Sequence, residues 1–324
     1  SVSLVQGTSD DSPDNSSIDV EQGAHEFQLP VTLENNTDVN IASASTLTLQ
    51  NALHLNGTTL TKMGGGTLSI RNDFSTGGGA LTVAEGTVSG GGTVGGDLSN
   101  VGGTIAPGNS PGVLTVDGNL TNSSGGTIAI EIEGTGGAGK ADGHDQIQVT
   151  GSSTLAGTLD ITTGAYADPT TRATRESFTL ISSAGGSTGT FDTVNYNGTE
   201  LTTSHQGNGL FRNVAYGDND VSLDNLLALE GDADGDADID ITDFNVLAAN
   251  FDSAGANAET NNWTTADFDS DGDVDITDFN FLAANFADSG YLAPANNQVP
   301  EPGTLILLLI GAAFVWTWQS LRRR

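Results

Sequence analysis

The chain has 324 residues, of which 41 are acidic and 9 are basic, so its net charge is −32 at pH 7. This excess of negative charge should repel nucleic acid and anionic membranes, and the lack of cysteine excludes disulfides, zinc–thiolate sites and cysteine nucleophiles. A chain of this length has room for two or three modules.

Residues 1–26 are polar and acidic, and we expect them to form a loose lead-in. The sequence starts at Ser1 and shows no charged stretch followed by an apolar one. We therefore expect a signal peptide to be either already removed or absent.

Residues 27–229 alternate short apolar runs with glycine clusters. Period-two alternation of β-branched and aliphatic residues indicates strands, and the glycines indicate tight turns. The runs recur every 15–20 residues or so, a spacing typical of a solenoid whose stacked coils share one core. We predict a mainly β fold, a right-handed parallel β-helix, with strands at 31–33, 46–49, 67–70, 81–83, 113–116 and 127–132 and closing strands at 178–181, 191–194 and 220–223.

Two segments of this region carry a family likeness. Residues 60–68 read L-T-K-M-G-G-G-T-L and residues 103–112 read G-T-I-A-P-G-N-S-P-G. Both resemble the autotransporter-associated β-strand repeats of passenger-type domains, and the likeness runs from about residue 40 to 225. The resemblance implies a β-helix and is nearly silent on activity, because function lies in sites grafted on folds.

Enzymatic alternatives in this region are weak. Ser110 fits a G-x-S-x-G nucleophile elbow with Asp145 and His205 as partners, but a strand follows it where a helix is required. Residues 134–141 approach a phosphate loop, yet Ala141 stands where Ser or Thr should hold magnesium, so we predict a turn around Lys140. Polysaccharide lyases also use β-helices with a basic residue beside acidic calcium ligands. The basic residues and histidines here look scattered instead: Lys62, Arg71, Lys140, Arg172, Arg175, Arg212, His25, His54, His144 and His205.

Residues 230–288 contain a duplicated aspartate ladder with an offset of 35 residues. We call residues 232–243 loop one and residues 267–278 loop two. A twelve-residue calcium loop takes oxygen ligands from positions 1, 3, 5, 7, 9 and 12, with glycine at position 6. These positions predict two calcium ions, held by Asp232, Asp234, Asp236, Asp238, Asp240 and Asp243 and by Asp267, Asp269, Asp271, Asp273, Asp275 and Asp278. Gly272 occupies position 6 of loop two, but Ala237 replaces it in loop one, so we expect loop one to be the weaker site.

The pattern of a calcium loop followed by one helix, repeated, resembles a type I dockerin. Here the last ligand is Asp where the usual EF-hand has Glu, and no helix is expected before either loop. Dockerins pair with cohesin modules through helix surfaces beside the calcium loops. The resemblance therefore implies a small α calcium-binding domain with a cohesin-like partner, contacted by Ile241, Thr242, Ile276 and Thr277.

The chain ends in a polar linker at 289–302 and an apolar segment at 303–324 that closes in arginines. Residues 303–321 would span about 28 Å as a helix, close to the thickness of a bilayer core. The arginines should stay on the cytoplasmic side. Together with the basic end, the Pro-Glu-Pro element resembles the PEP-CTERM sorting signal, which implies an exosortase-type processing enzyme; its elements are Val299, Pro300, Glu301, Pro302, Arg322, Arg323 and Arg324.

The sequence thus predicts a secreted, cell-surface structural or adhesive protein that is first anchored in the inner membrane by a transmembrane helix. One alternative is a carbohydrate-active protein, or a component of a polysaccharide-degrading assembly, recruited through its dockerin-like module. Extracellular polysaccharide would then be a partner. A third alternative is a matrix protein in which the aspartate module only stiffens a joint.

Overall fold

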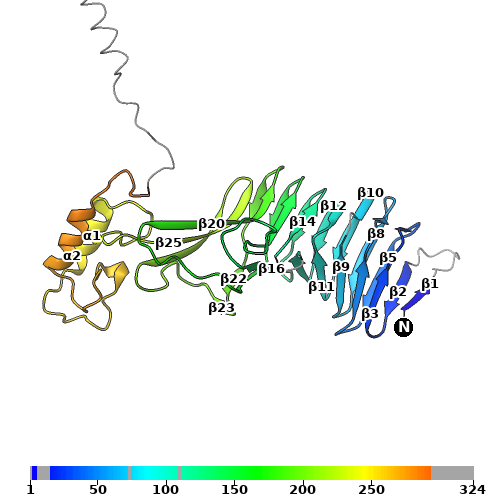
Figure 1. Cartoon of the computed structure of the whole chain (residues 1–324), viewed down its shortest axis with the longest axis horizontal. Coiled ribbons are helices and arrows are strands. Elements are labelled where there is room, and N and C mark those ends of the chain that lie inside the picture. Colours follow the sequence, from blue (N-terminus) through cyan, green and yellow to red (C-terminus); the bar gives the residue numbers. More distant parts are fainter. Residues whose placement is uncertain (1, 6–14, 72–73, 109–110, 293–324) are drawn as a thin grey trace, which may run out of the picture.

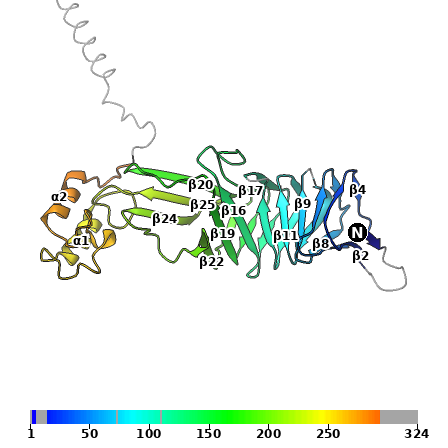
Figure 2. The same ribbon diagram turned by 60° about the horizontal axis from the view of Figure 1, so that its bottom comes forward.

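The computed structural model describes residues 2–5, 15–71, 74–108 and 111–292. The protein is mainly β, with two large, mostly parallel sheets that form an elongated body and two helices at its far end (Figures 1 and 2). This arrangement is consistent with the predicted solenoid.

The larger sheet has 14 strands. Its parallel part stacks one strand per coil, and β1, β25 and β24 add antiparallel strands at its ends. In sheet order the strands are β1 (Val2–Val5), β2 (Ser16–Val20), β5 (Thr37–Ile41), β8 (Thr59–Met63), β10 (Phe74–Val83), β12 (Thr93–Asn100), β14 (Val113–Val116), β17 (Gln146–Val149), β20 (Thr174–Ser183), β25 (Asp220–Leu227) and β24 (Leu210–Tyr216), with β15 (Leu120–Asn122), β18 (Ser153–Leu155) and β21 (Ser187–Gly189) as a branch.

The second sheet has 9 strands and is parallel except for its last pair. In chain order its strands are β3 (Ala24–Phe27), β6 (Thr46–Leu49), β9 (Thr67–Ile70), β11 (Thr87–Gly90), β13 (Thr104–Pro107), β16 (Thr127–Ile132), β19 (Thr158–Thr163), β22 (Thr193–Tyr196) and β23 (Thr199–Glu200). A small third sheet pairs β4 (Val31–Thr32) with β7 (Leu53–His54).

The core is built from columns of inward-facing aliphatic side chains. In register, Leu68, Val88, Ile105, Ile128 and Leu159 follow one another through five coils, and each is fully buried. A strand of only four residues is stable here because its neighbours supply both the backbone hydrogen bonds and the rest of the core.

Two expectations from the sequence need correction. Paired residues of neighbouring coils are 21–23 apart in the first coils, 17–20 apart from β9 through β11 to β13, and 31–34 apart in the later coils. The expected spacing of 15–20 residues therefore holds for these middle coils, and the other coils are longer. The parallel sheets also begin at β2 and β3, inside the stretch that we expected to form a loose lead-in.

After the last coils, β20, β25 and β24 form an antiparallel extension that leads to the aspartate loops. The loops are followed by α1 (Ile241–Asn250) and α2 (Ile276–Asn285), with a short 3-10 helix, η1 (Trp263–Thr265), between them. Phe211 and Leu226 of the extension share a second hydrophobic core with Ala233, Trp263 and Phe268 of the loop region. The module is therefore packed against the extension.

Candidate metal centre

Each aspartate ladder folds into a loop that ends in the first turn of a helix. Asp240 caps α1 and Asp275 caps α2, each accepting a hydrogen bond from the backbone N–H two residues later. Each cap is completed by the aspartate at position 12, Asp243 or Asp278, which accepts a hydrogen bond from the N–H of the capping residue. This reciprocal capping fixes positions 9 and 12 of each loop relative to each other.

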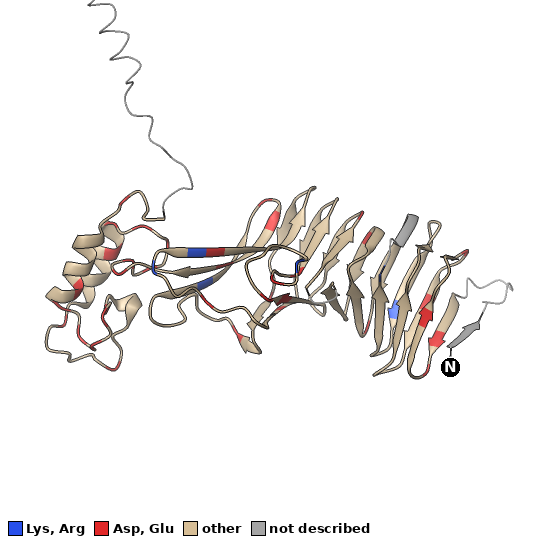
Figure 3. Cartoon of the chain, viewed as in Figure 1, with Lys and Arg blue, Asp and Glu red and all other residues tan. Residues whose placement is uncertain are grey.

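The carboxylates of each loop converge. Their oxygens form groups of three whose atoms lie within 4.8 Å of one another, and such groups could hold metal ions. The groups are Asp232, Asp234 and Asp236; Asp238, Asp240 and Asp243; Asp267, Asp269 and Asp271; and Asp273, Asp275 and Asp278. All twelve predicted ligands thus belong to such a group, two groups in each loop, and acidic residues gather at this end of the molecule (Figure 3).

The backbone at position 6 is left-handed in both loops. The φ angle is 77° at Ala237 and 92° at Gly272. The methyl group of Ala237 makes this conformation unfavourable in a way that Gly272 avoids, which is the physical reason for expecting loop one to be the weaker site.

The loops concentrate negative charge in partly dehydrated surroundings. Burial raises the pKa of Asp232 to about 6, with the nearby Asp243 adding to the shift. Burial, followed by repulsion from neighbouring carboxylates, also raises the pKa of Asp269. Both effects penalise the ionised state, so a cation bound in the loop would relieve them.

One atom provides a specific test of whether a metal fits. Asp267 is only 2% exposed, and its Oδ1 atom has no hydrogen-bond partner among the described residues. The Oδ1 atoms of Asp238 and Asp273 are likewise buried without partners. A buried carboxylate oxygen without a partner is unfavourable. Because every side-chain donor here is an oxygen, the loops fit a hard divalent cation such as calcium.

The two loops brace each other in a crossed manner. Ala287, which follows α2, pairs with Ile239 of loop one, whereas Asp252, which follows α1, pairs with Val274 of loop two. Ile239 and Val274 are the apolar residues at position 8, and both are fully buried. The segment after each helix therefore closes the other loop.

The residues predicted to contact a partner lie on the helix surface. Ile241 is 62% exposed and Ile276 is 58% exposed, although both are large and apolar. Thr242 and Thr277 beside them are exposed as well. Both repeats therefore present the same exposed Ile-Thr pair.

The candidate enzyme sites of the solenoid are not assembled among the described residues. Both oxygens of Asp145 accept backbone N–H groups, from Gly112 at 2.7 Å and from Glu131 at 2.9 Å. His205 contacts the ring of Phe211, and no hydrogen bond joins it to Asp145. Ser110 lies outside the described residues. The strand expected at residue 113 is present as β14.

Several polar residues that look scattered in the sequence are buried. Lys62 is fully buried, and its Nζ donates to the carbonyl oxygens of Met63, Gly64 and Glu85. His144 is 7% exposed and lies against the carbonyl oxygen of Thr179. Lys62 thus binds the carbonyl oxygens of turns between coils, whereas His144 lies against a strand, β20.

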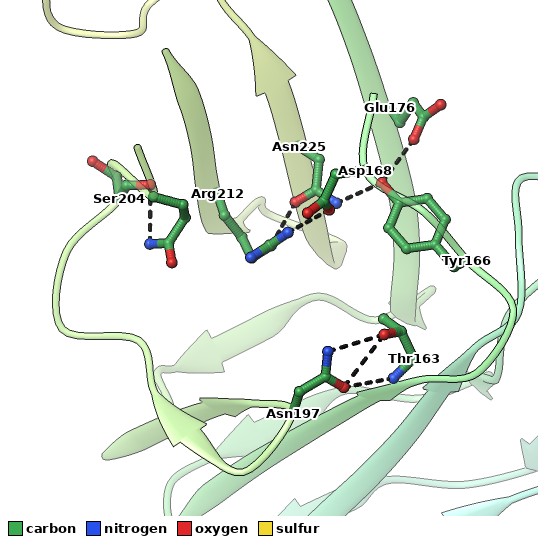
Figure 4. Close-up of polar contacts among 9 residues, drawn as sticks. Thr163, Tyr166, Asp168, Glu176, Asn197, Ser204, Arg212 and Asn225 are labelled. Carbon is green, nitrogen blue, oxygen red and sulfur yellow. Dashed lines mark hydrogen bonds and ion pairs between the residues drawn. The ribbon is translucent and has the colours of Figure 1, made fainter. Parts of the chain in front are cut away.

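Arg212 is also buried, and it organises a polar network beneath the extension (Figure 4). Its guanidinium donates to Asn225 at 2.9 Å and pairs with Asp168, and it stacks on Tyr196 at 3.6 Å from the ring centroid. Asn225 donates in turn to Tyr166. The network ties β24 and β25 to the last coil.

The sequence reading missed two residues of the aspartate module, Tyr291 and Trp263. Tyr291 donates to Asp232 Oδ2 at 2.6 Å, and the indole N–H of Trp263 donates to the carbonyl oxygen of Asp232 at 2.6 Å. Their only signal in the sequence is that they are aromatic, which they share with the phenylalanines of the same module.

The predicted linker end, transmembrane segment and sorting elements, within residues 293–324, lie outside the described residues. Among the residues that the structure does describe, none belongs to a helix long and apolar enough to cross a membrane. Residues 298–324 match the PEP-CTERM protein-sorting motif, which indicates an exosortase-dependent, extracellular cell-surface protein. The chain matches no curated protein.

Proposed function

We propose that this exosortase-sorted surface protein is a structural or adhesive component that engages a protein partner through a calcium-dependent, dockerin-like module carried on a β-helical stalk. The observation that carries the proposal is the buried Oδ1 of Asp267, which has no partner among the described residues, in a carboxylate whose group includes Asp269 and Asp271. The sorting match at residues 298–324 supports the location.

Each ion would be held by the six aspartates of its loop. When bound, calcium supplies a double positive charge that offsets the repulsion between carboxylates. The chain's own residues hold the loop in shape. Reciprocal capping holds positions 9 and 12 in place, and the crossed braces at Ile239 and Val274 keep the loops closed.

The partner surface we propose is formed by Ile241, Thr242, Ile276 and Thr277. Their exposure and their repetition on both helices support this assignment, because exposed large apolar residues often mark interaction sites. By resemblance, the partner is a cohesin-like module. Before it reaches the surface, the protein would be held in the inner membrane by residues 303–321 and then cut near Pro300-Glu301-Pro302.

The test is calorimetric titration of the full chain with calcium after treatment with a chelator. We expect two ions to bind, and we expect the double variant Asp269→Asn with Asp271→Asn to bind one. Asp160→Asn is the matched control, because Asp160 lies on β19 of the solenoid, outside both loops. Equal binding by the wild type and the double variant would show that calcium associates with the acidic surface at large.

The partner assignment has its own test. A cohesin module is titrated against the wild type and against a variant with Ile241→Asp and Ile276→Asp, in calcium and in chelator. We expect calcium-dependent binding that the variant loses while it still binds two ions. Retention of binding by this variant would refute the proposed surface.

A further inference from the structure

Tyr291 reaches from the end of the described chain back to loop one. Its hydroxyl donates to Asp232 Oδ2 at 2.6 Å and accepts a hydrogen bond from the N–H of Leu229 at 3.2 Å. Its own N–H donates to the carbonyl oxygen of Ala237 at 3.1 Å. Tyr291 thus contacts positions 1 and 6 of the loop at once.

The internal repeat provides a comparison within the same molecule. The offset of 35 residues places Ala256 where Tyr291 stands in the second repeat. Alanine has no hydroxyl group, so it offers no counterpart to the hydrogen bond that Asp232 Oδ2 accepts from Tyr291; the equivalent Oδ2 of Asp267 accepts from the N–H of Gly272 at 3.2 Å. The Oδ1 of Asp267, which has no hydrogen-bond partner among the described residues, corresponds to the oxygen that Gly235 holds in loop one. Asp232 is held on both oxygens, by Gly235 at 2.6 Å and by Ala237 and Tyr291. The first ligand of loop one is therefore fixed in orientation more fully than that of loop two.

The segment around Tyr291 is attached to loop one at more than one point. The N–H of Ala287 donates to the carbonyl oxygen of Ile239 at 3.0 Å, and the N–H of Ile239 donates back at 3.2 Å. We call residues 286–292 the stem, because the chain runs from there into the sorting motif that begins at residue 298. Loop two has a counterpart of this brace in the pair of Asp252 with Val274, so the contact that distinguishes loop one is the one made by Tyr291.

We infer that Tyr291 is a positioning residue for the calcium ion of loop one, and that calcium in loop one in turn fixes the stem from which the sorting tail emerges. The inference rests on the proposed calcium function. A partner that donates a hydrogen bond to a ligating carboxylate orients that ligand, and its removal typically weakens metal binding about 10- to 100-fold. The coupling is reciprocal by linkage: whatever the stem contributes to binding of the ion, the ion contributes to docking of the stem.

The test is Tyr291→Phe, which keeps the ring and removes the hydroxyl, in the full chain. This exchange is made in two double variants, each of which keeps one calcium loop intact. Asp269→Asn with Asp271→Asn leaves loop one as the binding site, and Asp234→Asn with Asp236→Asn leaves loop two. Calorimetry should show calcium affinity falling about tenfold or more in the first background and staying unchanged in the second. Equal affinities with and without the hydroxyl in the loop-one background would overturn the inference, as would equal losses in both backgrounds, which a merely structural role predicts.

Proteolysis supplies a second readout that does not depend on affinity. Chymotrypsin can cut after Phe286 and Tyr291 in the stem. Calcium should slow these cuts in the wild type and in the variant that keeps loop one, but not in the variant that keeps only loop two. Protection by loop two alone would contradict the assignment of the stem to loop one. A wild-type chain that binds no calcium would refute the proposed function itself, whereas two bound ions with an inert Tyr291→Phe exchange would refute only this inference.

Discussion

Replacing Gly272 by alanine should weaken loop two by an amount that can be worked out from the backbone. Gly272 has φ of 92°, and a left-handed conformation costs a residue with a side chain roughly 1–2 kcal/mol. The added methyl would also lie 3.1 Å from the Cβ of Ala258. Against this, alanine lowers the conformational entropy of the unfolded chain, which stabilises the fold by about 0.4–1 kcal/mol. The net loss is about 1 kcal/mol, or roughly a fivefold weaker site.

The reverse exchange in loop one is the matched control. Ala237→Gly relieves the same strain at φ of 77° but gives up the unfolded-state advantage of alanine. Ala237 is also 6% exposed in the second core, and loss of a buried methyl costs about 0.8 kcal/mol. These terms nearly cancel, so we expect calcium affinity at loop one to change less than threefold or so.

Calcium titration of both variants by calorimetry checks the pair, with circular dichroism in chelator to separate folding from binding. Gly272→Ala should weaken the binding of one of the two ions and leave the binding of the other unchanged. A Gly272→Ala chain that binds both ions as tightly as the wild type would refute the reasoning, because the strain would then not be carried by position 6.

Three further outcomes follow from the described contacts and from the tail. Arg172→Met removes an ion pair and the stacking of the guanidinium on Trp263 at 4.3 Å, and should lower the free energy of unfolding of the module by roughly 1–2 kcal/mol in urea; an unchanged midpoint would contradict this. Burial raises the pKa of Asp145 to about 6 from 3.8, so its contribution to stability is fully present below pH 3.8 and lost as the pH rises through 6. Melts of the wild type in chelator should therefore show a decline over that range which Asp145→Asn flattens, and parallel curves would argue against it. In the tail, replacing Pro300 and Pro302 by alanine should block processing, so mass spectrometry of surface-extracted protein should find chains that still end at Arg324; a normally trimmed product would exclude this role.

Regular strands could be predicted where the alternation was strong. Residues 46–49, 67–70, 113–116 and 127–132 were predicted as strands and form β6, β9, β14 and β16 with these bounds. Strands such as β11 and β12 were missed, because each is rich in glycine and carries only one or two inward aliphatic residues. Such segments become strands through the coils stacked on either side of them, and that information is absent from any local window.

Buried polar residues were missed for the same reason. Asn100 donates a hydrogen bond to Asn122 of the neighbouring coil at 2.7 Å, and both side chains are buried. A sequence presents them as turn residues, since nothing local shows that the coils bring them into register. Lys62 was likewise read as a scattered basic residue, although its ammonium group lies among carbonyl oxygens of a turn.

The aspartate loops could be predicted because their ligands are close in sequence and spaced by the geometry of the loop itself. The contact from Tyr291 spans 59 residues and could not be predicted. This difference bears on the ranking of the two sites. Ala237 on its own argues that loop one is weaker, through a backbone strain of at most about 1–2 kcal/mol that its buried methyl partly offsets.

Tyr291 acts in the opposite direction, and its about 10- to 100-fold effect corresponds to roughly 1.4–2.8 kcal/mol. The two ranges overlap between about 1.4 and 2 kcal/mol and that of the hydroxyl extends higher, so the contact from Tyr291 should offset most or all of the strain and loop one should bind about as tightly as loop two. The contacts of loop one also join it to other parts of the chain. Asp232 is held by Trp263 on its carbonyl and by Tyr291 on its carboxylate, so loop one lies where the extension, the linker between the repeats and the stem meet. A tight site at this meeting point would keep the module attached to the solenoid while loop two and the exposed helix faces remain free for a partner.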